Sequence, residues 1–172
     1  MLLLSSIDNR RQSVAQQVHE IRMVAYKQEA ELLRVERFPP LEERVADILE
    51  SSEEFVGAFD GEYLVGVLSV CPDDEGLGLS ISSLVVTPAQ QRRGVGDALV
   101  KAALGRHSTS NFTVQTAAAN APALALYARF GFKEYRRWAV GNEPLELVKL
   151  SRAPGAEACG SLRPCSIGRH CS

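Results

Sequence analysis

The chain has 172 residues, of which 45% are hydrophobic and 23% are charged, and its formal net charge is −2 at pH 7. These values are typical of one soluble globular domain with a sizeable core, and the slight negative charge disfavours a general nucleic-acid binder. The apolar run at residues 1–4 is too short for a signal peptide or a membrane span. We therefore expect a cytoplasmic protein with no membrane partner and no nucleic-acid partner.

The first half of the chain predicts a strand, two helices and a hairpin. Residues 2–7 read as a short strand, and Asp8 or Asn9 is placed to cap a long amphipathic helix that ends near Arg37. The Pro39-Pro40 pair breaks that helix, and a second one follows from Leu41 to about residue 50. Strands are then expected at residues 55–59 and 62–71, because Asp60-Gly61 between them is a two-residue hairpin signal.

The next predicted strand contains a slip in its alternation. Leu77, Leu79 and Ile81 alternate with small or polar residues, whereas Leu84 and Val86 fall on the opposite parity. One extra residue at Ser82-Ser83 would return all of these side chains to a single face, and an inserted residue of that kind is a β-bulge. A bulge leaves backbone groups unpaired, so they are available to a ligand.

A polar, glycine-containing loop follows this strand and leads into a helix. Pro88 ends the strand, and from Val95 onward the apolar residues keep a helical spacing. The first N–H groups of a helix have no internal partner and carry partial positive charge, so they bind anions. Gly94 and Gly96 leave these amides accessible, and Arg92 and Arg93 add full charges. The segment therefore predicts a site for a diphosphate.

The remaining chain predicts a strand at residues 112–116, a helix at 121–130, a strand at 132–140, a turn at Gly141-Asn142 and a strand at 145–150. Residues 151–172 are rich in Gly, Pro, Ser and Arg, and we expect them to form a flexible tail outside the 1–150 domain. Cys159, Cys165 and Cys171 lie there with His170, but they lack the short Cys-x2-Cys spacing of structural zinc sites. No metal site is predicted.

Two motifs together resemble one family. The segment Gln91-Arg92-Arg93-Gly94-Val95-Gly96 fits neither a Walker A loop nor the dinucleotide fingerprint, but it fits the pattern Gln/Arg-x-x-Gly-x-Gly/Ala. Asn120 and Tyr127 follow in a second segment that ends in Phe130-Gly131-Phe132. In this order the two motifs resemble the acetyl-CoA-binding segments of the GCN5-related N-acetyltransferase (GNAT) superfamily, over about residues 2–150.

The resemblance implies an α/β fold with a mixed, mostly antiparallel sheet, a splayed and bulged central strand, and helices on both faces. It also implies acetyl-CoA as co-substrate. The pantetheine arm would lie against the backbone of Leu84, Val85 and Val86 and beside Asn120, and Tyr127 would protonate the leaving thiolate. The diphosphate would be held by the run Gln91, Arg92, Arg93, Gly94, Val95, Gly96 and Asp97.

A base for the acceptor amine is harder to assign. In the branch that acetylates protein N-termini a Glu stands five residues before the Asn, and here that position is Gln115, which cannot take up the proton. Ser82 or Ser83 could instead order a water molecule. The alternative carboxylates are those of Asp73, Asp74 and Glu75 before the central strand, and of Glu31 and Glu36 near the helix turn.

The sequence thus predicts an N-acetyltransferase acting on a primary amine of a small molecule or a protein. His19, His107 and His170 lack a nucleophile context, so we expect direct attack of the amine in a ternary complex. An acyl-CoA-binding regulatory module without turnover is the alternative, and a nucleotide-binding regulator is a third possibility. The acceptor pocket is expected at residues 34–41 and 140–145, and Tyr135 with Trp138 could serve a homodimer contact or the core.

Overall fold

Seven strands and four α-helices make up residues 1–141 and 145–156, the part of the chain that the computed structural model describes. In chain order they are β1 (Leu2–Ile7), α1 (Gln12–Leu33), α2 (Val45–Glu50), β2 (Glu54–Asp60), β3 (Tyr63–Pro72), β4 (Leu79–Val86), α3 (Val95–Arg106), β5 (Phe112–Ala117), α4 (Ala121–Arg129), β6 (Lys133–Val140) and β7 (Leu145–Arg152). Two short 3₁₀ helices, η1 (Pro39–Glu42) and η2 (Pro88–Gln90), precede α2 and α3. The order of elements confirms the prediction.

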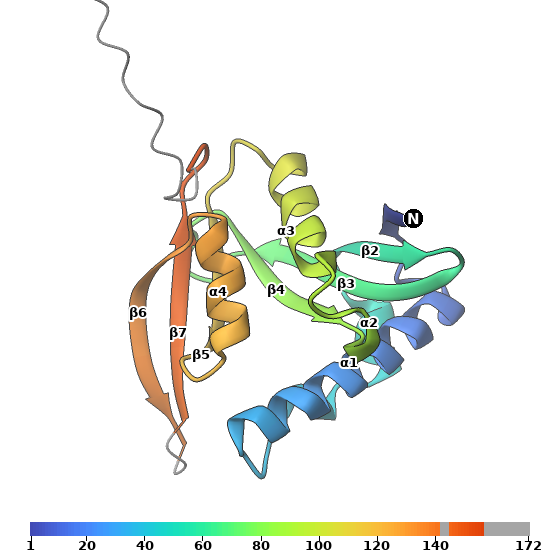
Figure 1. The fold of residues 1–172 in the computed structure, drawn as a ribbon, viewed down its shortest axis with the longest axis horizontal. Coiled ribbons are helices and arrows are strands. Elements are labelled where there is room, and N and C mark those ends of the chain that lie inside the picture. The colour runs from blue at the N-terminus through green and yellow to red at the C-terminus, as the bar shows by residue number, and fades with distance from the viewer. Residues whose placement is uncertain (142–144, 157–172) are drawn as a thin grey trace, which may run out of the picture.

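The strands form one sheet in the order β1-β2-β3-β4-β5-β7-β6 (Figure 1). All neighbouring strands are antiparallel except β4 and β5, which are parallel. β7 lies between β5 and β6, so β6 forms one edge of the sheet and β1 the other. The predicted mixed and mostly antiparallel sheet is therefore confirmed.

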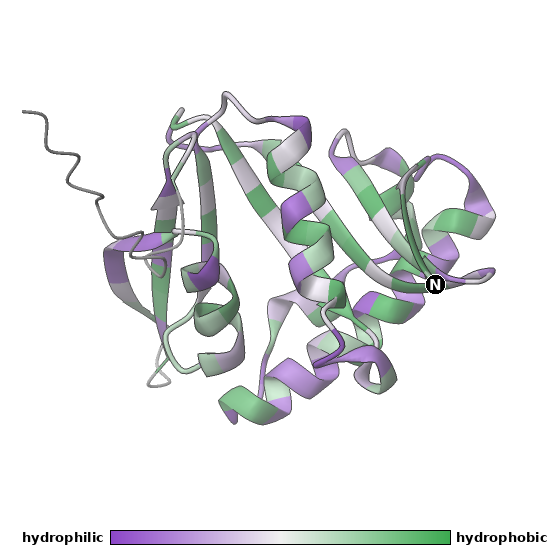
Figure 2. Cartoon of the chain, turned by 45° about the horizontal axis from the view of Figure 1, so that its top comes forward, coloured by the Kyte–Doolittle hydropathy of each residue, from purple (hydrophilic) through white to green (hydrophobic). Residues whose placement is uncertain are grey.

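Hydrophobic clusters cover both faces of the sheet. One cluster joins the strands to α3 and α4 and includes Leu68, Leu99 and Tyr127, whereas the other joins them to α1 and α2 and includes Val18 and Val67. Successive side chains of a strand point to opposite faces, which is why the neighbours Val67 and Leu68 belong to different clusters. In Figure 2 the central strands are largely hydrophobic, whereas β6 at the edge is largely hydrophilic.

The two ends of α1 differ from the prediction. The helix ends at Leu33, because Arg34 takes the left-handed conformation (φ 55°) and its N–H bonds back to carbonyls of the last turn. The expected cap at Asp8 or Asn9 is wrong, since the helix begins after Arg11 without a side-chain cap. Asn9 is instead buried, and its Nδ2 donates to the carbonyls of Ile48 (2.6 Å) and Ser51 (2.9 Å). It ties the start of α1 to the end of α2.

Other boundaries shift by a few residues. Leu41 lies in η1, so the second helix begins at Val45 rather than Leu41. β7 runs to Arg152, two residues past the expected end of the domain. The predictions for the tail cysteines and His170 lie outside the described residues, as does Asn142 of the last turn. None of the described helices is long and apolar enough to cross a membrane.

Candidate active site

The sheet opens between β4 and β5. These strands pair only at Leu79–Phe112, Ser80–Thr113 and Ile81–Val114. Beyond that point β4 continues along β3 as far as Val86, and β5 continues along β7 as far as Ala117. The facing edges of β4 and β5 are therefore unpaired over their second halves, and the sheet splays there as predicted (Figure 1).

The predicted β-bulge lies at the start of this opening. Ser69 of β3 pairs with Ser83 and the next residue, Val70, pairs with Ile81, so Ser82 is the extra residue. The bulge places Leu79, Ile81, Leu84 and Val86 against the same hydrophobic cluster, the one under α3 and α4. The parity slip in the sequence therefore had the structural cause that we predicted.

The bulge also decides which backbone groups face the opening. Thr87 N–H donates to the carbonyl of Val65 on β3, and in an antiparallel pair the groups of alternate residues point to the same neighbour. Val85 accordingly turns its N–H and C=O toward β3. Leu84 and Val86 turn theirs toward the unpaired edge. Both N–H groups and the Leu84 carbonyl are free there to bind an extended ligand, whereas the Val86 carbonyl accepts from Gln91 Nε2 (3.2 Å).

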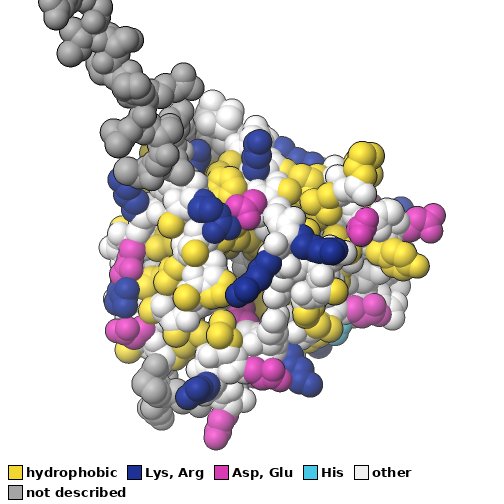
Figure 3. Space-filling model, viewed as in Figure 1, with side chains coloured by type: hydrophobic (Ala, Val, Ile, Leu, Met, Phe, Trp, Pro, Cys, Tyr) yellow, Lys and Arg dark blue, Asp and Glu magenta, His cyan; other side chains and the backbone are white. Residues whose placement is uncertain are grey.

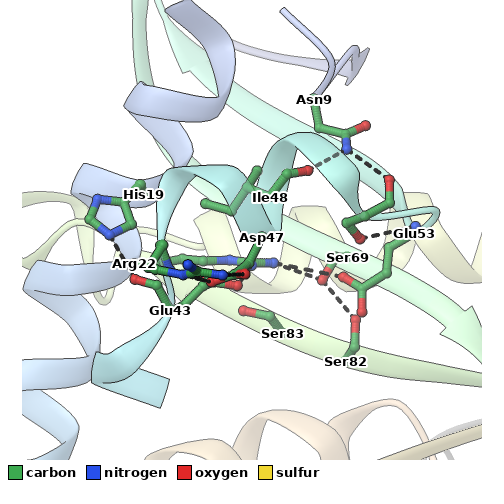
Figure 4. Close-up of polar contacts among 12 residues, drawn as sticks. Asn9, His19, Arg22, Glu43, Asp47, Ile48, Glu53, Ser69, Ser82 and Ser83 are labelled. Atoms are coloured by element: carbon green, nitrogen blue, oxygen red, sulfur yellow. Dashed lines mark hydrogen bonds and ion pairs between the residues drawn. The ribbon is translucent and has the colours of Figure 1, made fainter. Parts of the chain in front are cut away.

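A buried arginine lies behind the bulge (Figure 4). Arg22 of α1 is 3% exposed, and it donates to Glu43 Oε1 (2.6 Å) and to Ser69 Oγ (3.0 Å). The Ser69 hydroxyl in turn bonds the hydroxyl of the bulged Ser82 at 2.7 Å. This chain of hydrogen bonds fixes the position of the bulge from the face opposite to α3.

The loop after β4 presents the first turn of α3. Gly94 is the residue before the helix and has a left-handed conformation (φ 81°), and no side chain caps the helix. A Cβ on Gly94 would meet no atom within 4 Å, and one on Gly96 would reach only Leu126 Cδ2 at 3.4 Å. The amides of this turn are thus uncovered by protein side chains, as an anion site requires.

Gln91 has a different role from its neighbours in the loop. Its Nε2 donates to the carbonyl of Val86 (3.2 Å) and to Gln28 Oε1 on α1 (2.7 Å). The side chain therefore ties the loop to β4 and to α1 and does not extend toward the α3 amides. Arg93 also turns to a protein partner, because its Nη1 donates to Gln90 Oε1 at 3.3 Å.

A cleft of about 710 Å³ connects these features. Its walls come from α1, β4, the loop before α3, and α4, and it brings together all of the predicted site residues except Arg93. Arg129 of α4 and Asp97 of α3 both border it and form a two-bond ion pair at 3.0 Å, in which both side chains are about half exposed. Figure 3 shows Lys and Arg side chains around a hollow on this face.

Asn120 and Tyr127 form the α4 side of the cleft. Asn120 caps α4 as predicted, because its Oδ1 accepts from Ala123 N–H at 3.2 Å. Tyr127 is 4% exposed, and its ring packs edge-on against Phe132 with the centroids 5.4 Å apart. Burial, and then the charge of Glu29, raise the pKa of Tyr127 above its ordinary value. The phenol therefore stays protonated at neutral pH.

Glu29 is the site residue that the sequence analysis missed. It lies on the cleft wall formed by α1, and its Oε1 accepts from Asn120 Nδ2 at 3.2 Å. Glu29 could have been found from the sequence by its helical spacing from Ala25 and Leu32, because residues at this spacing share one face of α1 and all three border the cleft. Glu31 and Glu36, the carboxylates that we considered on this segment, are exposed and do not border it.

The family follows from comparison with known proteins. The model of the acetyltransferase (GNAT) family matches residues 15–132, more than half of the chain. The chain belongs to the GNAT acetyltransferase family. Members of this family generally use acetyl-CoA as co-substrate, which agrees with the resemblance of the two motifs.

Individual known proteins are similar to this chain in sequence or in fold. The protein UPF0157 YqkA of Bacillus subtilis (strain 168) is 30% identical over 133 residues, which cover 77% of this chain and 38% of YqkA. The chain thus spans less than half the length of that curated relative. Protein smu.2055 of Streptococcus mutans UA159 has a TM-score of 0.70 at 21% identity and covers 88% of this chain, with 98% of its own length covered.

The ribosomal-protein-S18-alanine N-acetyltransferase of Escherichia coli has a TM-score of 0.65 at 15% identity, with 95% of this chain and 99% of that chain covered. At such identities the solved structures establish the shared GNAT fold. They do not identify the acceptor of this GNAT protein, which has to be inferred from its own residues.

The loop carboxylates considered as bases lie at the closed end of the splay, in an ionic cluster. Lys149 Nζ is 3.0 Å from Asp73 Oδ1, 2.6 Å from Asp74 Oδ1 and 3.5 Å from Glu75 Oε1. Burial opposes ionisation of Asp73, but bonds from Thr113 and Lys149 and from two backbone N–H groups lower its pKa to about 2. Such a carboxylate is a poor proton acceptor at neutral pH.

Gln115, where another branch of the GNAT superfamily has a Glu, is exposed on β5 and pairs across the strands with Lys149. The charge of Lys149 would keep a carboxylate at position 115 ionised. This chain has the amide of Gln115 there, which cannot act as the base.

Tyr135 and Trp138 belong to neither hydrophobic cluster. The Tyr135 hydroxyl donates to Glu75 Oε2 at 3.1 Å, and the guanidinium of Arg136 lies 4.9 Å from the centre of the Trp138 ring. Of the two roles expected for Tyr135 and Trp138, a place in the core is therefore wrong. A homodimer contact through β6 stays a prediction.

Proposed function

We propose that this GNAT protein is an N-acetyltransferase that moves the acetyl group of acetyl-CoA to a primary amine by direct attack in a ternary complex. One observation carries the proposal. A single cleft leads from the open first turn of α3, along the unpaired edge of β4, to the buried hydroxyl-bearing ring of Tyr127. The diphosphate, the pantetheine arm and the thioester follow one another along acetyl-CoA in the same order as these three parts of the cleft.

The residues present suit acetyl-CoA for separate physical reasons. The diphosphate matches the uncapped α3 amides and the exposed Arg92, which also borders the cleft. The two amides of pantetheine match the backbone groups on the open edge of β4, where the N–H groups of Leu84 and Val86 and the carbonyl of Leu84 would otherwise have only water as a partner. Asn120 uses one of its two amide hydrogens for Glu29, so the other is free for the same arm.

The chemistry then needs few groups. The amine nitrogen forms a bond to the thioester carbon, the carbon–sulfur bond breaks, and the sulfur leaves as a thiolate. A backbone N–H on the open edge of β4 polarises the carbonyl as charge develops on its oxygen. Tyr127 is protonated at neutral pH and donates to the thiolate as it leaves.

The substitution Tyr127→Phe tests this assignment, because it removes the hydroxyl and keeps the packing on Phe132. With acetyl-CoA and a panel of primary amines, CoA release should fall by roughly 100-fold or more, while the affinity for acetyl-CoA changes little. The matched control is Tyr63→Phe, which alters a tyrosine 79% exposed on β3. Wild-type protein that binds acetyl-CoA but releases no CoA with any amine would support the regulatory binding module instead.

A further inference from the structure

Glu29 is an anion inside the predicted path of the pantetheine arm. It reaches across the cleft from α1 to Asn120 at the start of α4, and it borders the same cleft as Leu84 and Tyr127. Its charge acts on Tyr127, the residue expected beside the thioester sulfur. Glu29 is therefore on the side of the cleft where the acetyl group would lie.

This carboxylate has little compensation. Among residues 1–141 and 145–156, no Lys, Arg or His lies within ion-pair distance of Glu29, and its one side-chain hydrogen bond comes from the neutral amide of Asn120. A half-buried charge costs free energy unless it is paired. A residue of this kind in a cleft is a candidate for chemistry rather than for stability.

We propose that Glu29 accepts the proton that the acceptor amine loses during acetyl transfer, which rests on the function proposed above. An alkylamine arrives as an ammonium ion and first loses its extra proton through Glu29 to water, a step that a neutral amine does not need. The neutral nitrogen then bonds to the thioester carbon and gives one proton to Glu29, and the carbon–sulfur bond breaks. The thiolate leaves and receives one proton from Tyr127, and the proton held by Glu29 returns to Tyr127, so one proton of the neutral amine is exchanged for one thiol proton.

The surroundings of Glu29 suit this role. Burial raises the pKa of its carboxyl above the ordinary value, which makes it a better proton acceptor. The charged and titratable groups near it are Tyr127 on α4 and Tyr26 on α1, with Arg92 and the Asp97–Arg129 pair at the mouth of the cleft. Both tyrosines have raised pKa values and stay neutral at neutral pH, so Glu29 is the ionised group beside them that can accept a proton.

The test compares Glu29→Gln with Glu29→Ala. Gln keeps an oxygen that can accept from Asn120 but cannot take up a proton, whereas Ala loses both functions. Glu31→Gln is the matched control, because it makes the same change on an exposed residue two positions along α1. CoA release is followed against pH with the fastest alkylamine of the panel and with methoxyamine, which is already neutral at pH 7.

We expect Glu29→Gln to lower the rate with the alkylamine by roughly 100- to 10 000-fold and to lower it less with methoxyamine. With methoxyamine, wild-type activity should fall toward acid pH as Glu29 is protonated, and in Glu29→Gln this fall should shrink to the part that protonation of methoxyamine itself causes. Unchanged binding of acetyl-CoA would exclude a purely structural loss.

Two results would overturn the proposal in different ways. Full activity in Glu29→Gln with a loss in Glu29→Ala would mean that Glu29 only positions Asn120. Wild-type protein that releases no CoA with any amine would remove the acetyltransferase function itself.

Discussion

The conformation of Gly94 offers a sharp test of the anion site. This residue has a φ of 81°, and a Cβ there would touch nothing within 4 Å. Replacing it with Ala therefore adds only the cost of a left-handed backbone, about 1–2 kcal/mol. If the loop relaxes to a negative φ instead, the α3 amides move out of line with the diphosphate. Either way the loop is less ready to bind an anion.

Gly61→Ala is a matched control for Gly94→Ala. Gly61 lies in the β2–β3 hairpin with a φ of 62° and equally open surroundings, but it does not border the cleft. Both variants should lose about 1–2 kcal/mol of stability, which lowers the midpoint of thermal unfolding by roughly 3–8 °C at this size.

Only Gly94→Ala should weaken acetyl-CoA binding. A hydrogen bond to a charged group is worth about 1.5–3 kcal/mol, so losing one corresponds to roughly tenfold or more in the dissociation constant. Isothermal titration calorimetry measures it directly. If Gly94→Ala binds acetyl-CoA as tightly as Gly61→Ala does, the α3 turn is not the diphosphate site.

Two further perturbations probe the two ends of the splay. Lys149→Met should cost about 3 kcal/mol in urea unfolding at pH 7, because it leaves the buried Asp73 carboxylate without its cation. The pKa of Asp73 is lowered to about 2 in the folded protein. The ionised carboxylate therefore stabilises the folded state fully above an ordinary carboxyl pKa, and this stabilisation is lost as pH falls toward 2. At the open end, Arg129→Gln leaves Asp97 uncompensated beside the α3 amides, and acetyl-CoA should bind several-fold more weakly at low salt.

Each of these variants has its own check. The destabilisation by Lys149→Met should shrink as pH falls from 5 to 2.5, and a constant loss would show that lost packing rather than charge is responsible. The double variant Asp97→Asn/Arg129→Gln should recover most of the acetyl-CoA affinity. A double variant as weak as Arg129→Gln would mean that Arg129 contacts the ligand itself.

The sequence predicted features that depend on neighbours along the chain. The parity slip at Ser82-Ser83 indicated the bulge, and the cap at Asn120 and the hairpin at Asp60-Gly61 followed from local preferences. The glycine-containing loop likewise predicted an uncapped first turn of α3. The contacts that decide the cap, the hairpin turn and the first turn of α3 join residues only a few positions apart, and the bulge involves the strand directly before β4 in the chain.

Features set by distant partners were missed. Asn9 suits a helix cap locally, yet its amide bonds carbonyls 39 and 42 positions away. Besides Asp73, Asp74 and Glu75, the carboxylates considered as bases were Glu31 and Glu36, because the helix was expected to end near Arg37 and the side of α1 that faces the cleft was not identified. Glu29 becomes visible only when α1 is packed beside α4, since Asn120 lies 91 positions away.

Ligand-dependent thermal unfolding of the purified protein tests the central claim most directly. Acetyl-CoA at 100 times its dissociation constant adds about 2.7 kcal/mol, which should raise the midpoint by roughly 5–10 °C for a chain of this size. ATP and NADH serve as controls for general nucleotide binding. A rise with acetyl-CoA that neither control matches is the predicted result. Cooperative unfolding that acetyl-CoA leaves unchanged would contradict the account, because each proposed catalytic role depends on acetyl-CoA lying in the cleft between β4 and α4.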